Sequence, residues 1–517
     1  MRGRHRSGGG IERRAFLAGA AALLIAPPAH AKADTDADAA LHARLDGLAK
    51  LDSPAAKLNQ LQGISARGLS PGALLDLEAA REGLAIDARI AAIMPFGRLG
   101  RSPYSVTPSS GAWRDLGAPD AADRVAADTA RIRTEANAGV ILPRDALDRT
   151  VAGIAKAAAG AAGGVATALA EQARLLSSLA PRAGDPGVGR LPHGSEYFGL
   201  LIDRQFGERD AAAIHRRVLA KARDVGAEAD ELLARLGYAG KTTGERFRAA
   251  FRDPRFLYAD SEEGRDRAVA DMNRWLDRAR GQLPRLFGAL PPECANVAVR
   301  RMTPAEEAAK KAGYRVLPSP NGAPGSYFVD LSDIRRRPDW SLASVVHHEL
   351  LPGHMVQMPL DVRADPHAIR VEYTAGLSEG WAIHAEDLMA RQGAFVGDDR
   401  ARLGFLHWML FRLCRSLIDT GIHAERWTIR DARATLDAMQ GEPAFFATFD
   451  QDIERVCLEP ATRVGEVLTW LALTEGFDRL PAAARSRYRR GAIGDGRLRL
   501  SSLDRRLALP GPVRRSA

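Results

Sequence analysis

A proline–glycine pair inside a histidine-rich segment is the feature that most restricts how this chain can fold. Residues 347–354 read HHELLPGH, with Pro352 and Gly353 directly before the last histidine. Proline lacks the N–H that a helix requires, and its ring clashes with the carbonyl group four residues earlier, here that of His348. Glycine tolerates backbone angles that other residues avoid. A helix through this segment must therefore break or bulge before it reaches His354.

The break matters because a regular helix would keep these histidines apart. Six residues of helix turn through about 600°, which leaves His348 and His354 about 120° apart around the axis. His347 shares a face with His354 but lies about 10.5 Å away along the axis, too far for one ion with metal–nitrogen bonds near 2 Å. A two-residue bulge at the Pro-Gly pair would return His354 to the position that the common H-E-x-x-H motif gives its second histidine. The sequence thus predicts that His348 and His354 share one metal ion.

A downstream segment, SEGWAIHAEDL at 378–388, supplies the carboxylates that such a site needs. Glu379 follows His354 by 25 residues, enough for a loop and an antiparallel helix, and is the candidate third ligand. A catalytic site would keep its fourth position open for water. Glu386 lies on the same face and could orient a ligand histidine, while Glu349 could act as general base on a metal-bound water. A solvated charged helix with one core histidine is the alternative interpretation.

Helical periodicity dominates the rest of the chain. Apolar residues recur every three or four positions over 35–183 and again over 197–287. Just upstream of the histidines, NVAVRRM, YRVLPS and GSYFVDL alternate β-branched and aromatic residues and are separated by Pro and Gly, a pattern typical of strands. Further helices are expected over 375–395, 400–420 and 428–440. The predicted fold is mostly α, with a small β element just before the helix of the metal site.

On the second of these helices, Arg412, Arg415 and Asp419 share one face. We expect them to form a buried ion pair rather than to contact a substrate.

Residues 11–31, IERRAFLAGAAALLIAPPAHA, are typical of a targeting segment. Arg13 and Arg14 precede a short apolar run, and Ala29-His30-Ala31 offers small residues for cleavage. The run is shorter than the roughly 20 residues that span a bilayer. An arginine pair followed by Ala-Phe-Leu resembles a twin-arginine export signal, and that route suits a protein that loads its metal before export. A general secretory signal and an uncleaved lipid-facing anchor are the alternatives.

The expected location is therefore periplasmic or secreted, with the twin-arginine export machinery as a partner. No other stretch is long and apolar enough to cross a membrane, so we expect no stable membrane insertion once the signal is removed.

The net charge of +9 does not point to nucleic acid. Arginines concentrate in the first 31 residues and in residues 485–517, which leaves 32–484 mildly acidic. That main part carries no basic stripe interleaved with aromatic residues, the pattern that follows a nucleic-acid backbone. A nucleic-acid function is therefore not expected.

Several segments, in order along the chain, resemble one bacterial family. HHELLPGHMVQ, EGWAIHAE and RSLIDTGIHAERWT are similar to the HExxPGH, EGWA and DTGIH signatures of the Domain of Unknown Function 885 family. That family is similar to the glutamate-liganded, gluzincin-like zinc metallopeptidases. The likeness begins at YFGLLIDRQFG, near residue 197, and reaches SRYRRGAIGDGRLRLSSLD near the C-terminus, with a looser match over 35–180.

The resemblance implies a large helical metallopeptidase-like fold and a zinc-dependent hydrolase of peptides or small amides. One Zn²⁺ ion would be held by His348, His354 and Glu379, with Glu349 activating the water. It also implies that His423, in DTGIH, stabilises the oxyanion of the tetrahedral intermediate. Considered on its own, a histidine beside Gly421 could equally be a structural residue at a helix end.

The sequence departs from the family on the substrate side. Where relatives read roughly R-Y-x-x-W-P-G-Q-A-x-x-Y-K-x-G, this chain has RVCLEPATRVGEVLT, with Val456 and Glu466 in place of the two tyrosines. Loss of a transition-state donor at the second position would raise the barrier by on the order of 3 kcal/mol. His384 likewise replaces the tyrosine of EGWAxY, and Tyr488-Arg489 replaces Phe-His.

Three functions remain open on this basis. The first is an exported zinc-dependent hydrolase of peptide or similar amide bonds, and the second is a metal-binding pseudo-peptidase with weak or no activity, suggested by the missing tyrosines. The third is a di-iron carboxylate protein, although such sites place Glu and His three residues apart rather than five. The expected organisation is a signal peptide at 1–31, an N-terminal helical region at 32–180, a Pro/Gly-rich connection at 181–198, a catalytic region at 199–508 and a tail at 509–517.

Overall fold

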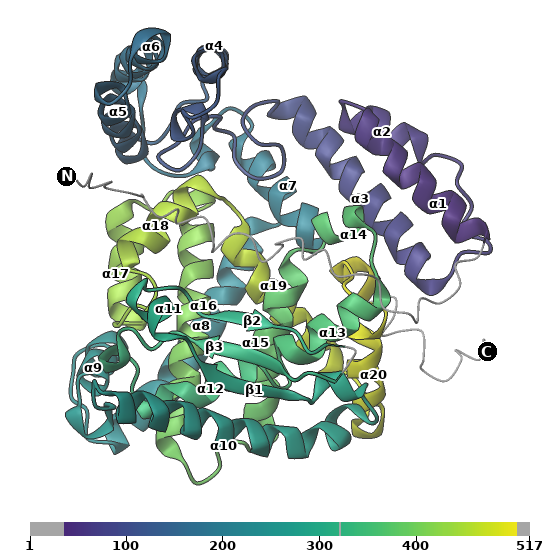
Figure 1. Ribbon diagram of the computed structural model, residues 1–517, viewed down its shortest axis with the longest axis vertical. Coiled ribbons are helices and arrows are strands. Elements are labelled where there is room, and N and C mark those ends of the chain that lie inside the picture. The colour runs from purple at the N-terminus through teal and green to yellow at the C-terminus, as the bar shows by residue number, and fades with distance from the viewer. Residues whose placement is uncertain (1–35, 320–321, 504–517) are drawn as a thin grey trace, which may run out of the picture.

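The computed structural model describes residues 36–319 and 322–503, and within them the chain is mostly helical, as Figure 1 shows. The targeting segment and the tail at 509–517 lie outside the described residues. The helices before the sheet are α1 (Asp36–Gly47), α2 (Pro54–Gln60), α3 (Pro71–Ile93), α4 (Ala121–Asn137), α5 (Arg144–Ala159), α6 (Gly163–Leu179), α7 (Gly194–Phe206), α8 (Ala211–Arg235), α9 (Thr243–Phe251) and α10 (Glu262–Phe287).

The later helices include the three that carry the predicted metal ligands, α12, α13 and α15. They are α11 (Pro304–Ala308), α12 (Leu342–Glu349), α13 (His354–Ala364), α14 (Ala368–Glu372), α15 (Gly376–Arg391), α16 (Asp399–His423), α17 (Ile429–Met439), α18 (Phe449–Leu458), α19 (Thr462–Asp478) and α20 (Ala482–Gly494). The mostly α fold class is thereby confirmed.

Local sequence explains where many helices begin and end. Before α8, the side chain of Asp210 accepts a hydrogen bond from the backbone N–H of Ala213 (2.9 Å), which satisfies a donor that the first turn leaves free. After α8, Gly237 adopts a φ of +86°, a conformation that favours glycine and ends the helix. The preceding helix, α7, begins at Gly194, inside the range 181–198 that the sequence predicted as a connection.

The three predicted strands form one sheet. They are β1 (Val297–Arg301), β2 (Tyr314–Val316) and β3 (Gly325–Val329), in the order β1-β3-β2. β1 runs parallel to β3, and β2 runs antiparallel to it, with Arg315 opposite Tyr327. β2 is therefore an edge strand of this sheet.

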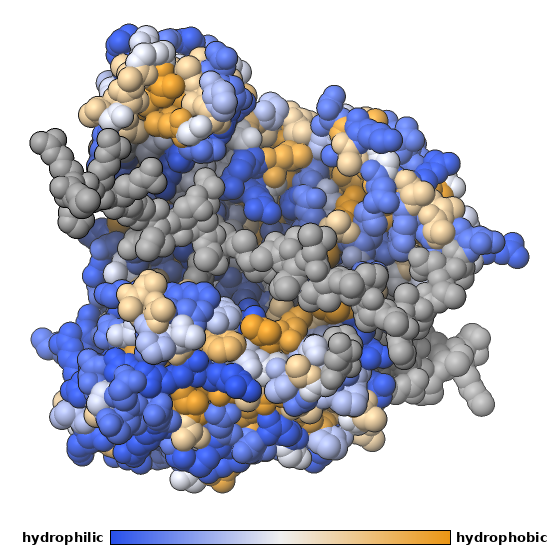
Figure 2. Space-filling view, viewed as in Figure 1, coloured by the Kyte–Doolittle hydropathy of each residue, from blue (hydrophilic) through white to orange (hydrophobic). Residues whose placement is uncertain are grey.

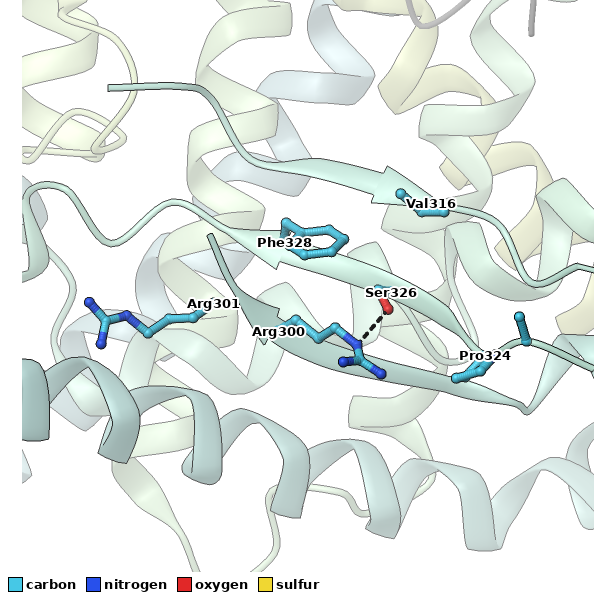
Figure 3. Close-up of a pocket in the computed structure, with 7 residues that line it drawn as sticks. Arg300, Arg301, Val316, Pro324, Ser326 and Phe328 are labelled. Carbon is cyan, nitrogen blue, oxygen red and sulfur yellow. Dashed lines mark hydrogen bonds between the residues drawn. The ribbon is translucent and has the colours of Figure 1, made fainter. Parts of the chain in front are cut away.

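The two faces of the sheet differ because successive side chains of a strand alternate between them. The outer face carries Val316, Ser326 and Phe328 together with Arg300, which donates a hydrogen bond to Ser326 (2.9 Å; Figure 3). The inner face carries Tyr327, which is 5% exposed, and Arg315, which reaches Glu349 at the end of α12. The inner face therefore lies toward the histidine-bearing helix.

A long central helix holds the core together. α16 is buried along nearly its whole length and packs against α8, α12 and α19. α10 runs along β1 and also contacts α12 (Figure 1). α12 therefore sits between the sheet layer and the central helix, where its side chains are buried on almost every face.

The viewed face of the molecule is largely hydrophilic, with hydrophobic residues gathered in separate patches (Figure 2). Among the described residues, none of the helices has both the length and the apolar character needed to cross a bilayer.

Candidate metal centre

The histidine segment forms two helices separated by a four-residue break. α12 ends at Glu349 and α13 begins at His354, so the chain leaves the helical path altogether instead of bulging by two residues as the sequence suggested. A Cβ atom on Gly353 would lie 2.0 Å from the carbonyl oxygen of His348, so only glycine fits this turn. Its φ of −73° is ordinary, which means that close backbone approach is what requires glycine here.

A tryptophan from the neighbouring helix stabilises the break. Trp381 is fully buried, and its indole N–H donates a hydrogen bond to the carbonyl oxygen of Pro352 (3.0 Å). Beside it, a Cβ atom on Gly380 would lie 2.2 Å from that of Thr469, so this glycine lets α15 and α19 approach closely. The EGWA segment thus places Glu379 against the broken helix through its packing residues.

The break brings the three predicted ligands together. His348 and His354 lie with ring centroids 4.9 Å apart and planes at 88°. Nε2 of each histidine lies 3.3 Å from a carboxylate oxygen of Glu379, and the candidate ligand atoms of the three residues all lie within 4.8 Å of one another. Two ligands bound tetrahedrally at about 2 Å from one ion are separated by roughly 3.3 Å. The group therefore could hold a metal ion.

Hydrogen bonds fix which nitrogen of each histidine faces this group. Nδ1 of His348 lies 2.8 Å from Oε1 of Glu386 and 2.9 Å from Nη2 of Arg412, which donates to that same carboxylate oxygen (2.7 Å). Because the Arg412 guanidinium is held by Glu386, we assign the Nδ1 hydrogen to the bond with this carboxylate, which turns Nε2 toward the group. The hydroxyl of Ser378 donates to Gln357 (2.9 Å), which leaves it to accept from Nδ1 of His354 (3.3 Å). Nε2 of His354 is buried, and within the described part of the chain it has no hydrogen-bond partner, although Oε1 of Glu379 lies 3.3 Å away. The Nε2 atoms of both histidines thus point where a metal would bind.

The electrostatics of the group favour a cation. Burial, the largest influence, acts to lower the pKa of His348, but Glu379 and Glu386 outweigh it and raise that pKa to about 9. Desolvation opposes ionisation of Glu379, yet His354 and His348 hold its pKa well below the usual range. The carboxylates on either side of His348 therefore stabilise positive charge at this point.

Glu386 is itself held by two further side chains. It is fully buried, accepts a hydrogen bond from the hydroxyl of Ser344, and forms a 2.7 Å ion pair with Arg412. Although burial alone would raise it, the pKa of Glu386 is lowered by Arg412 and His348, so the carboxylate remains ionised. This is the arrangement in which a carboxylate orients a metal-ligating imidazole.

Replacing Glu386 with glutamine is expected to weaken zinc binding by about 10–100-fold, because the amide holds the His348 ring less firmly. Competition with a chelating dye measures this affinity. Glu475→Gln, on the exposed side of α19, is the matched control. Because Glu386→Gln leaves the buried Arg412 without its counter-ion, circular dichroism must show that this variant is folded. A folded variant with unchanged zinc affinity would rule out the orienting role.

Glu349 lies beside the three candidate ligands and is paired with a cation. Its carboxylate forms an ion pair with the guanidinium of Arg315 from β2, and the side chain is 19% exposed. Burial acts to raise the pKa of Glu349, but Arg315 and the two ligand histidines together lower it. Glu349 is thus an ionised carboxylate one residue from the candidate ligand His348, and only an ionised carboxylate can accept a proton.

His423 is held by the backbone on both sides. Its Nδ1 accepts a hydrogen bond from the N–H of Val188 (3.0 Å), and its Nε2–H donates to the carbonyl oxygen of Val456 (2.9 Å). Burial lowers its pKa to about 4, so the ring is neutral. Both ring nitrogens are hydrogen-bonded to the backbone, as expected for a structural histidine at a helix end. The oxyanion role implied by the family resemblance is therefore not supported for His423.

The other charged residues of α16 pair with neighbouring elements and not with one another. Arg415 lies 3.1 Å from Asp452, and Asp419 accepts hydrogen bonds from the backbone N–H groups at the start of α19, including that of Arg463 (2.9 Å). The predicted mutual ion pair is therefore replaced by separate buried contacts.

The positions where the chain departs from the family also have defined partners. Glu466 pairs with Arg463 (2.8 Å), Val456 is buried, and Nδ1 of His384 lies 3.0 Å from the hydroxyl of Thr474. None of these contacts reaches the three candidate ligands.

Comparisons with known proteins agree with the fold. A family model described as "Bacterial protein of unknown function (DUF885)" matches residues 114–473, more than two thirds of the chain. The match extends further toward the N-terminus than the motifs that begin near residue 197. No curated protein matches the sequence.

Two solved structures share the architecture. One is described as "the putative lipoprotein from Colwellia psychrerythraea", with 19% identity, a TM-score of 0.69 and coverage of 91% of this chain and 96% of that one. The other is "a putative lipoprotein of unknown function from Shewanella oneidensis", with 15% identity, a TM-score of 0.62 and coverage of 89% and 92%. At these identities the likeness shows a common fold.

Proposed function

The chain belongs to the DUF885 family, and from its candidate site we propose that it is an exported zinc-dependent hydrolase of peptide or similar amide bonds. The family description assigns no activity, so the proposal depends on the chemistry of the residues. The observation that carries it is the convergence of His348, His354 and Glu379 beside Glu349.

The donor set fits zinc, although the same two histidines and one carboxylate also suit non-haem iron(II). Two imidazole nitrogens and one carboxylate oxygen form the three-ligand set of many catalytic zinc sites, in which a fourth position stays open. The unsatisfied, buried Nε2 of His354 gives the set a reason to bind a cation. The side chain of Glu379 is 44% exposed, which supports access of solvent and substrate from its side.

When bound, zinc supplies Lewis acidity, because it polarises a carbonyl group and lowers the pKa of a water toward neutrality. Glu349 takes one proton from the attacking water as the water oxygen bonds to the carbonyl carbon. The same carboxyl group then gives the proton to the leaving nitrogen as the C–N bond breaks. One water is consumed, and one carboxylic acid and one amine are released.

A metal-binding protein with weak or no catalysis is the second candidate. It is favoured by the residues at the positions of the family tyrosines, since Val456 is buried and Glu466 is paired with Arg463. With both nitrogens of His423 bonded to the backbone, that residue offers no donor to an oxyanion. The di-iron alternative has less support, because Glu349 pairs with Arg315 and His384 contacts Thr474.

Export is proposed on two grounds. The arginine pair and apolar run of residues 11–31 favour the twin-arginine machinery as a partner. The two solved relatives are each described as a "putative lipoprotein", which is consistent with a place in the cell envelope. We therefore propose a periplasmic or secreted location.

The proposal is tested on the full chain folded in the cell. Elemental analysis should find about one zinc per chain, and a peptide library should be hydrolysed, with activity lost on treatment with a chelator and restored by zinc. Iron in place of zinc would contradict the proposal. Full zinc loading without any hydrolysis would favour the metal-binding alternative.

A further inference from the structure

An arginine reaches the proposed active site from the edge of the sheet. Arg315 is the central residue of β2 and lies opposite Tyr327 on the inner face. Its neighbours Tyr314 and Val316 lie on the outer face, where Val316 borders the pocket drawn in Figure 3. β2 thus sends one cation toward the candidate ligands and keeps its apolar residues, Tyr314 and Val316, on the other side.

In the proposed reaction, the residue that pairs with the Arg315 guanidinium is needed for another role. The guanidinium is paired with the carboxylate of Glu349, the proposed general base. Once Glu349 turns to its water, Arg315 loses this counter-ion while only 26% of its side chain is exposed. A partly buried cation left in this way favours a new anionic partner.

The charge of the loaded site points to the same kind of partner. A zinc ion brings two positive charges, which Glu379 and Glu349 offset, and the buried Arg412 and Glu386 neutralise each other. Arg315 then leaves one positive charge in excess. Its side chain is partly exposed, as are those of Glu349 and Glu379, so a substrate group could reach it.

From these contacts we infer that Arg315 binds a free carboxylate of the substrate, so that the protein removes residues from the C-terminal end of peptides. A guanidinium suits this role because it holds a carboxylate through two parallel hydrogen bonds. The inference rests on the proposed hydrolytic function and names its substrate class. Internal peptide bonds, whose flanking groups are neutral amides, would lack this contact.

The test compares each library peptide with its C-terminal amide on the zinc-loaded protein. The free acids are expected to have kcat/KM about 10–100-fold higher, as for other hydrogen bonds to charged groups. Arg315→Ala should remove this ratio, and Arg315→Lys should keep part of it. Arg300→Ala, on the outer face of the same sheet, is the matched control and should leave the ratio unchanged. The ratio is informative because any disturbance of Glu349 affects both substrates alike.

Binding gives a second readout that does not depend on turnover. Calorimetry should find N-acetyl-alanine bound about 10-fold or more tightly than N-acetyl-alanine amide by the zinc-loaded protein, and equally by Arg315→Ala. If the unaltered protein cleaves acids and amides with equal kcat/KM and binds them with equal affinity, the inference is wrong, but the proposed hydrolysis still holds. If no peptide is cleaved, the proposed function fails, and calorimetry still decides the carboxylate site.

Discussion

Replacing Glu349 with glutamine is expected to lower kcat/KM for peptide hydrolysis by about 100- to 10,000-fold while the protein keeps one zinc per chain. The amide is nearly the same size as the carboxylate and can still accept a hydrogen bond, but it cannot take a proton from water. Glu349 is not one of the three candidate ligands, so the metal content should not change. Initial rates on the best library substrate, with zinc measured in the same samples, test the expectation.

Glu475→Gln provides the control for the loss of one carboxylate, because that residue pairs with Arg217 on the surface. It should retain the activity of the unaltered protein. If Glu349→Gln hydrolyses peptides as fast as the unaltered protein does, Glu349 is not the general base. If Glu349→Gln loses its zinc together with its activity, the loss of activity cannot be attributed to proton transfer.

Replacing His354 with alanine should reduce bound zinc from about one per chain to near zero and weaken zinc affinity by more than the 10–100-fold expected for Glu386→Gln. The change removes one of three protein ligands, whereas Glu386 acts only through His348. Elemental analysis after dialysis against a weak chelator gives the metal content, and thermal unfolding with and without zinc should lose its zinc-dependent shift.

His384→Ala is a close control for this experiment. His384 is also a buried histidine, but it lies on α15 against Thr474, away from the candidate ligands. It should keep its zinc, even if the loss of packing lowers its stability. Equal zinc content in His354→Ala and the unaltered protein would show that the metal binds elsewhere.

Residue patterns predicted most of the fold, because helices and strands follow from local periodicity. The three strands and the helices around the histidines lie within a few residues of their predicted ranges. The Pro-Gly pair correctly predicted that the helix breaks before His354. The size of the break was not predictable, because it depends on the close approach of Gly353 to the carbonyl oxygen of His348 and on the hydrogen bond from Trp381.

The contacts that the sequence did not reveal are long-range. Arg315 lies 34 residues before Glu349, and its place on the inner face depends on the register of β2 against β3. An arginine between Tyr314 and Val316 was the available signal, since alternation places it on the opposite face. For His423 the sequence could not distinguish an oxyanion-stabilising role from a structural one, because its partner Val188 lies 235 residues away.

The measurement that tests the metal centre most directly is anomalous X-ray diffraction at the zinc edge on crystals of the zinc-loaded protein. A single strong peak is expected about 2.0–2.2 Å from Nε2 of His348, Nε2 of His354 and a carboxylate oxygen of Glu379. A peak beside other residues, or no peak in protein that contains zinc by elemental analysis, would contradict the proposed metal centre.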